Sequence, residues 1–463
     1  MKKIVISLFI LLSLSANVEA QYYSESTVSA YPGLPYNPSV LGRVQNKLVS
    51  FLDTEQGFGV YAQDTISKTV DKLISVDRAK LNRERLSSNY FTTPNGLLID
   101  VFGKLYLSNG TAAGTSLLKD FGETDNARFA PIRVSRIVNI ELVGNTIFVT
   151  RAGESAFYSE SDYTIWRIDL DTAQANLISD PNTQGLTMIA GSALNDSAVA
   201  FGYNESKGYS FWRVSLEQDH LSYINGFSGE LDRRLMVSGK SVQSRTGLVF
   251  CRTSIAESDS SLWRLSADGR LTRLAGNCSG VFDTNNGDKD SFFFTTNDGF
   301  WKGNGYPDGN VRLLQIDSNS QVNAVCISNS TALISLTHLD PVRPTSATTL
   351  DTQTGLSKNF PDVEFTGSCL KNRVLLITNR DVIPTKLFVY DSRVDTLYDV
   401  KRTPILFSVN SAVEVGEDIF FASQPFSRVV DELVPAAGQL SQLTFKHGDF
   451  MSFLPSILDI LGE

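Results

Sequence analysis

Short runs of alternating apolar and polar residues recur along the chain, and each run has the length of one β-strand. The clearest example is 261–275, where apolar residues alternate on both sides of Asp268-Gly269. An Asp-Gly pair between two such runs predicts a β-hairpin with a tight two-residue turn. The pattern therefore predicts an all-β chain of short antiparallel strands.

Tryptophan marks an internal repeat in this pattern. All four tryptophans of the chain follow an apolar residue and precede Arg or Lys, in Ile165-Trp166-Arg167, Phe211-Trp212-Arg213, Leu262-Trp263-Arg264 and Phe300-Trp301-Lys302. A shared register of all four indicates repeated structural units. We interpret the Trp as a packing residue between units, because a packing position recurs in each unit whereas a catalytic site occurs once.

The unit around Trp166 shows how four strands fit together. Apolar runs at 137–143, 146–150, 163–168 and 175–179 are separated by turn residues, including Gly144-Asn145. These runs predict a four-stranded antiparallel meander, which is the shape of a propeller blade. Both faces of the predicted strands are apolar, as expected for sheets packed between two neighbours.

Units of this kind fill most of the chain. Their markers are Tyr61, Tyr106, Trp166, Trp212, Trp263, Trp301, Thr349, Phe388 and Leu433. Nine candidate units predict a β-propeller of seven to nine blades, if some of the less regular units are only parts of blades. Such a propeller is a single large domain.

The N-terminus has the three parts of a secretory signal peptide. Lys2-Lys3 precede the apolar run Ile4–Leu14, and the small Ala20 suits cleavage before Gln21. The apolar run is shorter than the roughly 20 residues of a membrane span. We therefore expect a signal peptide at 1–20, an N-terminal extension at 21–39, the propeller at 40–463, and a periplasmic or secreted protein.

The C-terminal stretch 449–461 is too apolar to lie free in water. An open stack of blades would expose two sheet edges, so the first and last blades of a ring are expected to join. We interpret Phe450–Leu454 as the closing strand, with its partner in the first unit near Leu48–Leu52. The alternative is an amphipathic segment that binds a partner.

One unit carries a family resemblance. The stretch Lys104–Phe121 contains Tyr106, Asn109-Gly110-Thr111, Gly114-Thr115 and Lys119-Asp120. It resembles the bacterial repeat written ELWxTDGTxxGTxLVKDI, also called hyalin-like, with Tyr106 at the Trp position and Asn109 at the Asp position. The resemblance is clear over this stretch alone. It implies propeller blades and no chemistry of its own.

Charge and cysteine content narrow the possible partners. The formal net charge of −9 without basic clusters argues against nucleic acid and anionic membranes. The four cysteines, Cys251, Cys278, Cys326 and Cys369, allow three disulfide pairings, and four free thiols are the alternative. Cys326 and Cys369 precede equivalent strands in successive units, so we expect these two to lie near one another.

Catalytic and metal-binding motifs are weak. There is no Gly-x-Ser-x-Gly motif, and the three histidines, His220, His338 and His447, fall in predicted loops, which does not favour a nucleophilic triad. The stretch Asp283–Asp290 has oxygen ligands at alternate positions but lacks the closing Glu of a calcium loop, so a polar turn is favoured. The turn Asn304–Gly309 could contact a glycan, although a hairpin turn is the simpler interpretation. We assign no catalytic, metal or cofactor-binding residues and expect no cofactor.

These observations favour an exported, non-catalytic propeller scaffold that binds a protein or glycan on one face of the ring. A propeller-fold polysaccharide hydrolase or lyase and a surface adhesion protein are the alternatives. Close carboxylates or a histidine at the mouth of the ring would favour the enzyme. The choice among these functions stays open, because fold class alone does not determine function. The sequence does not specify the oligomeric state.

Overall fold

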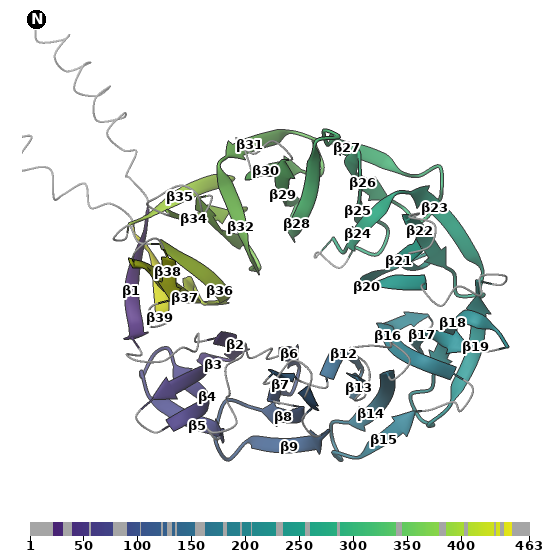
Figure 1. Ribbon diagram of the computed structural model, residues 1–463, viewed down its shortest axis with the longest axis horizontal. Coiled ribbons are helices and arrows are strands. Elements are labelled where there is room, and N and C mark those ends of the chain that lie inside the picture. Colours follow the sequence, from purple (N-terminus) through teal and green to yellow (C-terminus); the bar gives the residue numbers. More distant parts are fainter. Residues whose placement is uncertain are drawn as a thin grey trace, which may run out of the picture.

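The computed structural model of the chain describes residues 22–30, 39–54, 57–76, 90–101, 103–121, 124–126, 132–134, 137–152, 163–178, 183–194, 197–204, 206–227, 235–254, 260–284, 288–338, 345–378, 386–401, 406–429, 432–435 and 439–446. Within these residues every regular element is a β-strand, and the strands form nine four-stranded antiparallel blades in a ring (Figure 1). The fold is a nine-bladed β-propeller, which confirms the predicted fold class at the upper end of the expected blade number.

The first four blades follow one another in sequence order, each with its first strand toward the centre of the ring and its fourth at the outside (Figure 1). A small hairpin of β10 (Thr124–Asn126) and β11 (Ile132–Val134) lies between the second and third blades in sequence. The strands are β2 (Ser39–Val44), β3 (Lys47–Thr54), β4 (Gly57–Asp64) and β5 (Val70–Ser75) in blade 1; β6 (Tyr90–Thr93), β7 (Gly96–Val101), β8 (Lys104–Ser108) and β9 (Thr115–Asp120) in blade 2; β12 (Ile137–Val143), β13 (Thr146–Ala152), β14 (Tyr163–Asp169) and β15 (Ala175–Ile178) in blade 3; β16 (Thr183–Leu194), β17 (Ser197–Asn204), β18 (Gly208–Val214) and β19 (Leu221–Gly226) in blade 4.

The next four blades repeat this plan, and each consists of four consecutive strands. The meander predicted around Trp166 is thus the common plan of eight blades. The strands are β20 (Leu235–Ser244), β21 (Gly247–Ser254), β22 (Ser260–Leu265) and β23 (Leu271–Gly276) in blade 5; β24 (Cys278–Phe282), β25 (Phe292–Thr296), β26 (Gly299–Gly303) and β27 (Val311–Gln315) in blade 6; β28 (Ser320–Ser328), β29 (Thr331–His338), β30 (Thr345–Asp351) and β31 (Ser357–Pro361) in blade 7; β32 (Val363–Cys369), β33 (Arg373–Thr378), β34 (Leu387–Asp391) and β35 (Thr396–Lys401) in blade 8.

The ninth blade combines both ends of the described chain. Its strands are β36 (Leu406–Val415), β37 (Asp418–Val429), β39 (Gln439–Lys446) and the N-terminal β1 (Tyr22–Ala30), while β38 (Glu432–Pro435) extends β37 as a side hairpin. Strand β1 runs antiparallel to β39, from Tyr22↔Lys446 to Ala30↔Gln439. It also pairs in parallel with β35 at Tyr23↔Val400. The N-terminal strand therefore closes the ring and joins the outer edges of blades 8 and 9 (Figure 1).

This closure differs from the expected one. Within the expected extension 21–39, residues 22–30 form β1, which is part of the propeller. The proposed closing strand Phe450–Leu454 lies outside the described residues. Its predicted partner Leu48–Leu52 is part of β3, whose two edges are already paired with β2 and β4, so that pairing is wrong.

A polar residue at the end of the third strand repeats more widely than tryptophan. In eight blades, the residue three positions after the marker of the third strand accepts hydrogen bonds from the amides of the following turn. In blade 7 the marker position is Thr348. The accepting residues are Asp64, Asn109, Asp169, Ser215, Ser266, Asn304, Asp351 and Asp391. Such turns orient the fourth strand in eight blades without a two-residue hairpin.

Two expected details therefore need correction. The turn at Asp268-Gly269 is longer than predicted, because β22 ends at Leu265 and β23 begins at Leu271. Gly269 has a positive φ of 84°, which favours glycine there. The marker Leu433 lies in the side strand β38, and the third strand of blade 9 is β39.

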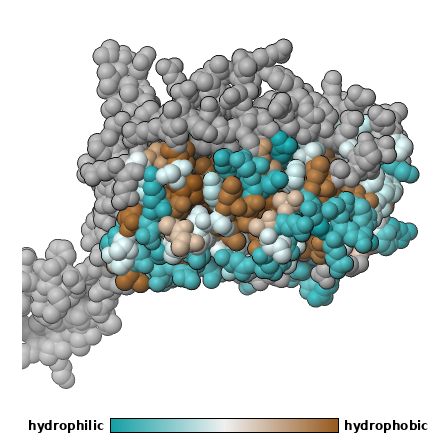
Figure 2. All heavy atoms as spheres, turned by 90° about the horizontal axis from the view of Figure 1, so that it is seen from below, coloured by the Kyte–Doolittle hydropathy of each residue, from teal (hydrophilic) through white to brown (hydrophobic). Residues whose placement is uncertain are grey.

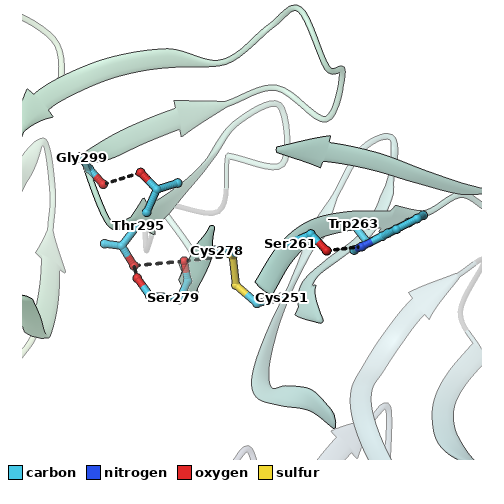
Figure 3. The surroundings of a disulfide bond; sticks show 9 residues. Cys251, Ser261, Trp263, Cys278, Ser279, Thr295 and Gly299 are labelled. Atoms are coloured by element: carbon cyan, nitrogen blue, oxygen red, sulfur yellow. Dashed lines mark hydrogen bonds between the residues drawn. A yellow bond between two sulfur atoms is a disulfide. The ribbon is translucent and has the colours of Figure 1, made fainter. Parts of the chain in front are cut away.

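Two disulfides link neighbouring blades. Cys251 of β21 bonds to Cys278 of β24, between blades 5 and 6, with Cα atoms 5.6 Å apart (Figure 3). Cys326 of β28 bonds to Cys369 of β32, between blades 7 and 8, with Cα atoms 5.5 Å apart. The expected proximity of Cys326 and Cys369 is confirmed, and the alternative of four free thiols is wrong.

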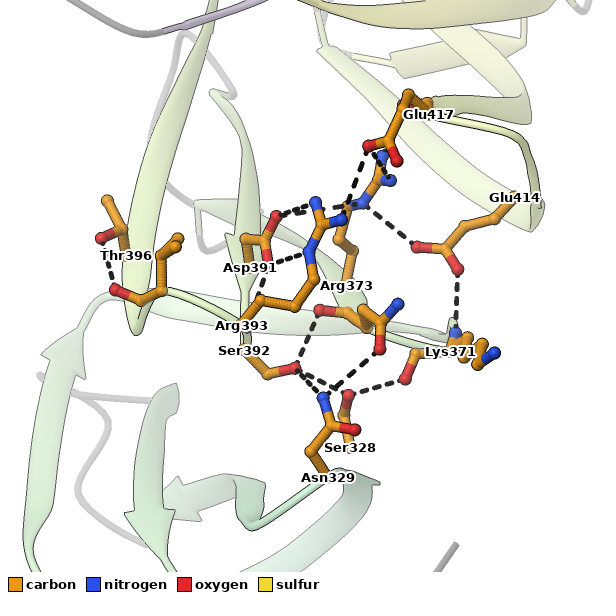
Figure 4. Close-up of polar contacts among 12 residues, drawn as sticks. Ser328, Asn329, Lys371, Arg373, Asp391, Ser392, Arg393, Thr396, Glu414 and Glu417 are labelled. Carbon is orange, nitrogen blue, oxygen red and sulfur yellow. Dashed lines mark hydrogen bonds and ion pairs between the residues drawn. The ribbon is translucent and has the colours of Figure 1, made fainter. Parts of the chain in front are cut away.

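A buried charged cluster joins blades 8 and 9 (Figure 4). The Arg373 side chain is 2% exposed and contacts Glu414 at 3.3 Å and Glu417 at 3.1 Å, with Asp391 at 4.0 Å. Burial raises the pKa of Glu414, against the opposing effect of Arg373. The pKa of Asp391 is lowered, because hydrogen bonds and charge from Arg393 outweigh the effect of burial. The cluster offsets the cost of burying Arg373 only while its partners are ionised.

The outer wall of the ring is partly apolar (Figure 2). Leu117, Leu177 and Tyr223 lie on the fourth strands of blades 2, 3 and 4, opposite the aromatic marker of the third strand, and are 42–47% exposed. The Tyr223 ring packs edge-on against Trp212 of the neighbouring strand, with ring centroids 5.5 Å apart. No helix in the described part of the chain is long and apolar enough to cross a membrane.

Candidate active site

His338 is held between two serine hydroxyls. Its Nδ1 lies 2.8 Å from Oγ of Ser320, and its Nε2 lies 2.9 Å from Oγ of Ser346. A neutral imidazole has one N–H donor and one acceptor nitrogen. One serine therefore donates its hydroxyl proton toward the ring, and the other accepts the ring N–H.

Strand register brings these three residues together. Ser320 begins β28, the innermost strand of blade 7, and pairs directly with His338 at the end of β29. Ser346 lies near the start of β30, diagonal to His338 on the same face of the sheet, because Ser346 pairs with Leu336. The group lies at one end of blade 7, next to the inner wall of the ring.

The surroundings of the three residues differ in exposure. Ser346 is 5% exposed, whereas Ser320 and His338 are partly exposed. On the same face, Val322 and Leu336 belong to the apolar cluster between blades 6 and 7. Apolar neighbours strengthen the hydrogen bonds of the imidazole by limiting competition with water. Ser320 is the hydroxyl that a ligand can reach.

A comparison between blades separates this group from the repeat. Ser346 occupies the position two residues before the marker, as do Ser210 and Ser261 in blades 4 and 5. Ser210 bonds to backbone carbonyl oxygens, and Ser261 accepts a hydrogen bond from Nε1 of Trp263 at 2.9 Å (Figure 3). The serine position is therefore structural in those blades, and in blade 7 it contacts a histidine.

The arrangement is suited to nucleophilic catalysis. A serine within hydrogen-bond reach of a base, which is in turn oriented by a third group, is the geometric signature of an activated nucleophile. Here Ser320 is the reachable hydroxyl, His338 the base, and the buried Ser346 the orienting group. His338 was expected in a loop, but it is the last residue of β29, and the expected position is therefore wrong.

The other sequence candidates are placed apart from this group. His220 lies in the exposed turn between β18 and β19, and His447 is outside the described residues. In the calcium-like stretch, Asp288 accepts hydrogen bonds from the Asp290 amide and the Ser291 hydroxyl. The described residues contain no cluster of three metal-ligating side chains.

The turn Asn304–Gly309 and the Trp-Arg pairs have structural contacts. The Asn304 side chain accepts the Tyr306 amide within the turn. Arg264 lies over the Tyr306 ring at 5.3 Å and donates to the Gly305 carbonyl. These contacts agree with the interpretation of the Trp-Arg repeat as inter-blade packing.

Comparisons of the chain with known proteins found similar solved structures at low identity. No protein-family model matches the chain, and no curated protein sequence matches it. Similar solved structures include a puromycin-hydrolyzing peptidase of Mycobacterium tuberculosis, at 10% identity and a TM-score of 0.37 over 65% of this chain and 53% of that one. A post-proline cleaving enzyme of Rickettsia typhi matches at 10% identity and a TM-score of 0.41, over 85% and 58% of the two chains. The propeller domain of the Trilobed protease of Pyrococcus furiosus matches at 10% identity and a TM-score of 0.32, over 65% and 82%.

These neighbours correct the functional expectation. They are peptidases or a domain of one, which contradicts the expected non-catalytic scaffold that binds a protein or glycan. This chain spans little more than half the length of the first two. At such low identity the likeness concerns the fold alone, so no residue role is transferred from these proteins to this chain.

Proposed function

We propose that this propeller is a serine-type hydrolase that cleaves an acyl bond at the inner end of blade 7. The observation that supports the proposal is the contact of both His338 ring nitrogens with serine hydroxyls. Esters and amides are the bonds that an activated serine attacks. The site belongs to one blade, as expected for a catalytic group in a repeat protein.

The reaction follows from the positions of the three side chains. Ser320 Oγ attacks the carbonyl carbon while its proton passes to Nδ1 of His338. His338 then donates that proton to the leaving group as the bond between the carbonyl carbon and the leaving group breaks. Water, deprotonated by the same imidazole, releases the acyl group from Ser320. Ser346 holds the imidazole in the orientation that both proton transfers need.

We further propose that the protein acts outside the cytoplasm. The signal-peptide pattern of residues 1–20 supports this, and so do the two disulfides, since such bonds persist in oxidising compartments. Protease accessibility in intact cells, together with the N-terminal sequence of the mature protein, tests the proposal. A cytoplasmic protein that begins at Met1 would contradict it.

A covalent probe tests the catalytic proposal directly. We expect a fluorophosphonate to label the full-length protein at Ser320, as identified by peptide mapping, and Ser320→Ala to abolish labelling. Hydrolysis of p-nitrophenyl acetate and of a mixed peptide library should fall with it. Ser210→Ala is the matched control, because Ser210 holds the position equivalent to Ser346 in blade 4 and should leave labelling unchanged. Labelling that persists in Ser320→Ala would contradict the assignment.

The two supporting residues make separate predictions. Loss of the base in His338→Ala should reduce turnover by about 10²–10⁴-fold. Ser346→Ala should lower kcat by a smaller factor and leave KM unchanged, because Ser346 acts through the imidazole and does not contact substrate. Equal activity of all three variants and the wild type would overturn the proposed function.

A further inference from the structure

The seam between blades 8 and 9 has no disulfide. All four cysteines of the chain belong to the bonds that join blade 5 to blade 6 and blade 7 to blade 8. Blades 8 and 9 instead share an apolar cluster, which includes Leu375 and Val389 of blade 8 and Phe421 and Leu443 of blade 9. The charged cluster around Arg373 lies beside the turns that follow β32 and β36 in the same seam (Figure 4). Non-covalent contacts therefore determine how tightly these two blades associate.

Glu414 faces blade 8 from the innermost strand of blade 9. It is the penultimate residue of β36, and its carboxylate points toward Arg373, the first residue of β33 (Figure 4). The Glu414 side chain is 13% exposed. On the other face of β36, Val413 and Val415 pack toward blade 1. The carboxyl group is therefore enclosed between blades 8 and 9.

The ion pair of Glu414 is incomplete. Its Oε1 lies 3.3 Å from Nε of Arg373, but neither of these two buried atoms makes a hydrogen bond within the described part of the chain. Its Oε2 accepts the backbone amide of Lys371 at 3.2 Å. A buried carboxylate with incomplete hydrogen bonding is costly to keep ionised, and the neutral carboxyl is less costly to bury.

Arg373 keeps other partners when Glu414 is neutral. Its Nη1 donates to the Glu417 carbonyl at 2.6 Å, and its Nη2 donates to the Glu417 carboxylate at 3.1 Å. Asp391 lies 4.0 Å from Nε and accepts two hydrogen bonds from Arg393, at 3.0 Å and 2.6 Å. Protonation of Glu414 thus leaves two carboxylates beside the buried guanidinium.

Burial has the largest effect on the acidity of Glu414, and it raises the pKa of this carboxyl. The opposing influences, in order of size, are the Arg373 charge, the Lys371 amide, the Arg393 charge and the Asn372 amide. A folded-state pKa above the unfolded value gives stability that is fully present below the unfolded value and is lost as pH rises through the folded-state pKa. Proton uptake by Glu414 therefore stabilises the folded ring.

The other strands packed against β36 add three charged groups among the side chains that the structure describes. Glu364 is the second residue of β32, whereas Glu414 is near the opposite end of β36. Arg43 of β2 is exposed, and Asp418 of β37 accepts a hydrogen bond from Gln442 at 2.6 Å. None of these three has a printed ion pair with Glu414, so Arg373 is its direct counter-charge.

We propose that Glu414 is a proton switch in the seam between blades 8 and 9, which holds these blades together more tightly in mildly acidic solution than at neutral pH. Proton uptake removes the buried charge that the cluster compensates least, and proton release restores it. The switch does not involve Ser320 or His338, so it is independent of the proposed hydrolase chemistry.

Native-state hydrogen exchange of the full-length protein tests the switch. After correction for the intrinsic exchange rate at each pH, we expect the backbone amides of β33 and β36 to exchange at least about threefold more slowly at about pH 5 than at about pH 7.5. Amides of β21 and β24, in the disulfide-linked seam between blades 5 and 6, should show no such change. Amides of β33 and β36 that exchange equally fast or faster at the lower pH would overturn the proposal.

Glu414→Gln tests the role of the proton, because glutamine has nearly the shape of the neutral carboxyl. We expect the β33 and β36 amides of this variant to exchange slowly at both pH values, as in the acidic wild type. Glu217→Gln is the matched control, since Glu217 is in an exposed turn of blade 4 and this variant should follow the wild-type pH dependence. A Glu414→Gln protein that exchanges faster than the wild type at neutral pH, or that does not fold, would show that the seam needs the charge and would contradict the switch.

Difference infrared spectroscopy detects the bound proton itself. At about pH 5, the wild type should show the carbonyl band of one protonated carboxylic acid that Glu414→Gln lacks, and this band should disappear as the wild type is brought to neutral pH. Identical carboxylic-acid bands in the two proteins would rule out Glu414 as the proton-binding group.

Discussion

At the scale of single residues, the sequence predicted packing better than turn chemistry. The register of Trp166, Trp212, Trp263 and Trp301 was visible because tryptophan is rare. The residue three positions later varies among Asp, Asn and Ser, which accept the same backbone hydrogen bonds. Because the residue type varies, this repeated position was not recognised from the sequence. Asn109 holds this position in the stretch that resembles the hyalin-like repeat, and its role there is to shape a turn.

The turn aspartates predict an acid-sensitive ring. Backbone amides of the turn lower the pKa of Asp64, Asp169 and Asp351 below the ordinary value near 3.8. A lowered folded-state pKa adds stability at pH values above the ordinary pKa, and this stability is lost as pH falls toward the folded-state pKa. We expect the triple Asp→Asn variant, which keeps the acceptor oxygens, to lose less stability between pH 5 and pH 2 than the wild type. Parallel pH curves of the two in urea melts would contradict this.

Replacement of Arg373 is expected to lower the free energy of unfolding strongly, because its charge is buried. Arg373→Met should destabilise the fold by about 3–5 kcal/mol, because Asp391 and Glu414 keep their burial and lose a partner. Arg245→Met is the control: its side chain is 77% exposed and pairs at 2.8 Å with Asp290, which is 57% exposed, so we expect less than about 1 kcal/mol. Denaturant unfolding of both variants measures the difference. Similar losses would show that burial does not set the strength of this cluster.

At the scale of elements, local patterns predicted strands, and non-local pairing decided the site. The meander 137–179 was predicted almost to the residue, because its alternation and Gly144-Asn145 turn are local signals. Thr349 was placed one residue away from the equivalent position, Thr348, because blade 7 has no aromatic marker. The contacts of His338 depend on the register of β28 and β30 against β29, and no local pattern gives that register.

The disulfide between blades 7 and 8 is expected to contribute measurably to the stability of the fold. The cysteines are separated by 43 residues, and closing a loop of that length stabilises the folded state by about 4 kcal/mol in the chain-entropy model. We expect the Cys326→Ser, Cys369→Ser double variant to lose about that amount in urea melts. Mass mapping of unreduced peptides should find Cys326 linked to Cys369. Peptides with both thiols free would refute the bond.

At the scale of the whole molecule, the sequence predicted a closed ring but not the strand that closes it. The tail 449–461 is apolar and was therefore predicted to contain the closing strand, whereas Tyr22–Ala30 is rich in Ser and Thr and lacks a strong strand pattern. A closing strand at the outside of a blade is held in the sheet by backbone hydrogen bonds rather than by the burial of an apolar face. Composition therefore carries little information about such a strand.

Strand β1 is expected to stabilise the closed ring. Deletion of 22–30 should lower the melting temperature by at least several degrees and promote aggregation, since it leaves the facing edges of β39 and β35 unpaired. Deletion of 449–463 is the matched comparison, because it removes none of the nine described blades' strands. We expect a synthetic peptide of sequence Tyr22–Ala30, added to the first truncated protein, to restore most of the lost melting temperature by pairing along β39. A peptide without effect, or a truncated ring that melts like the full chain, would show that β1 does not hold the ring closed.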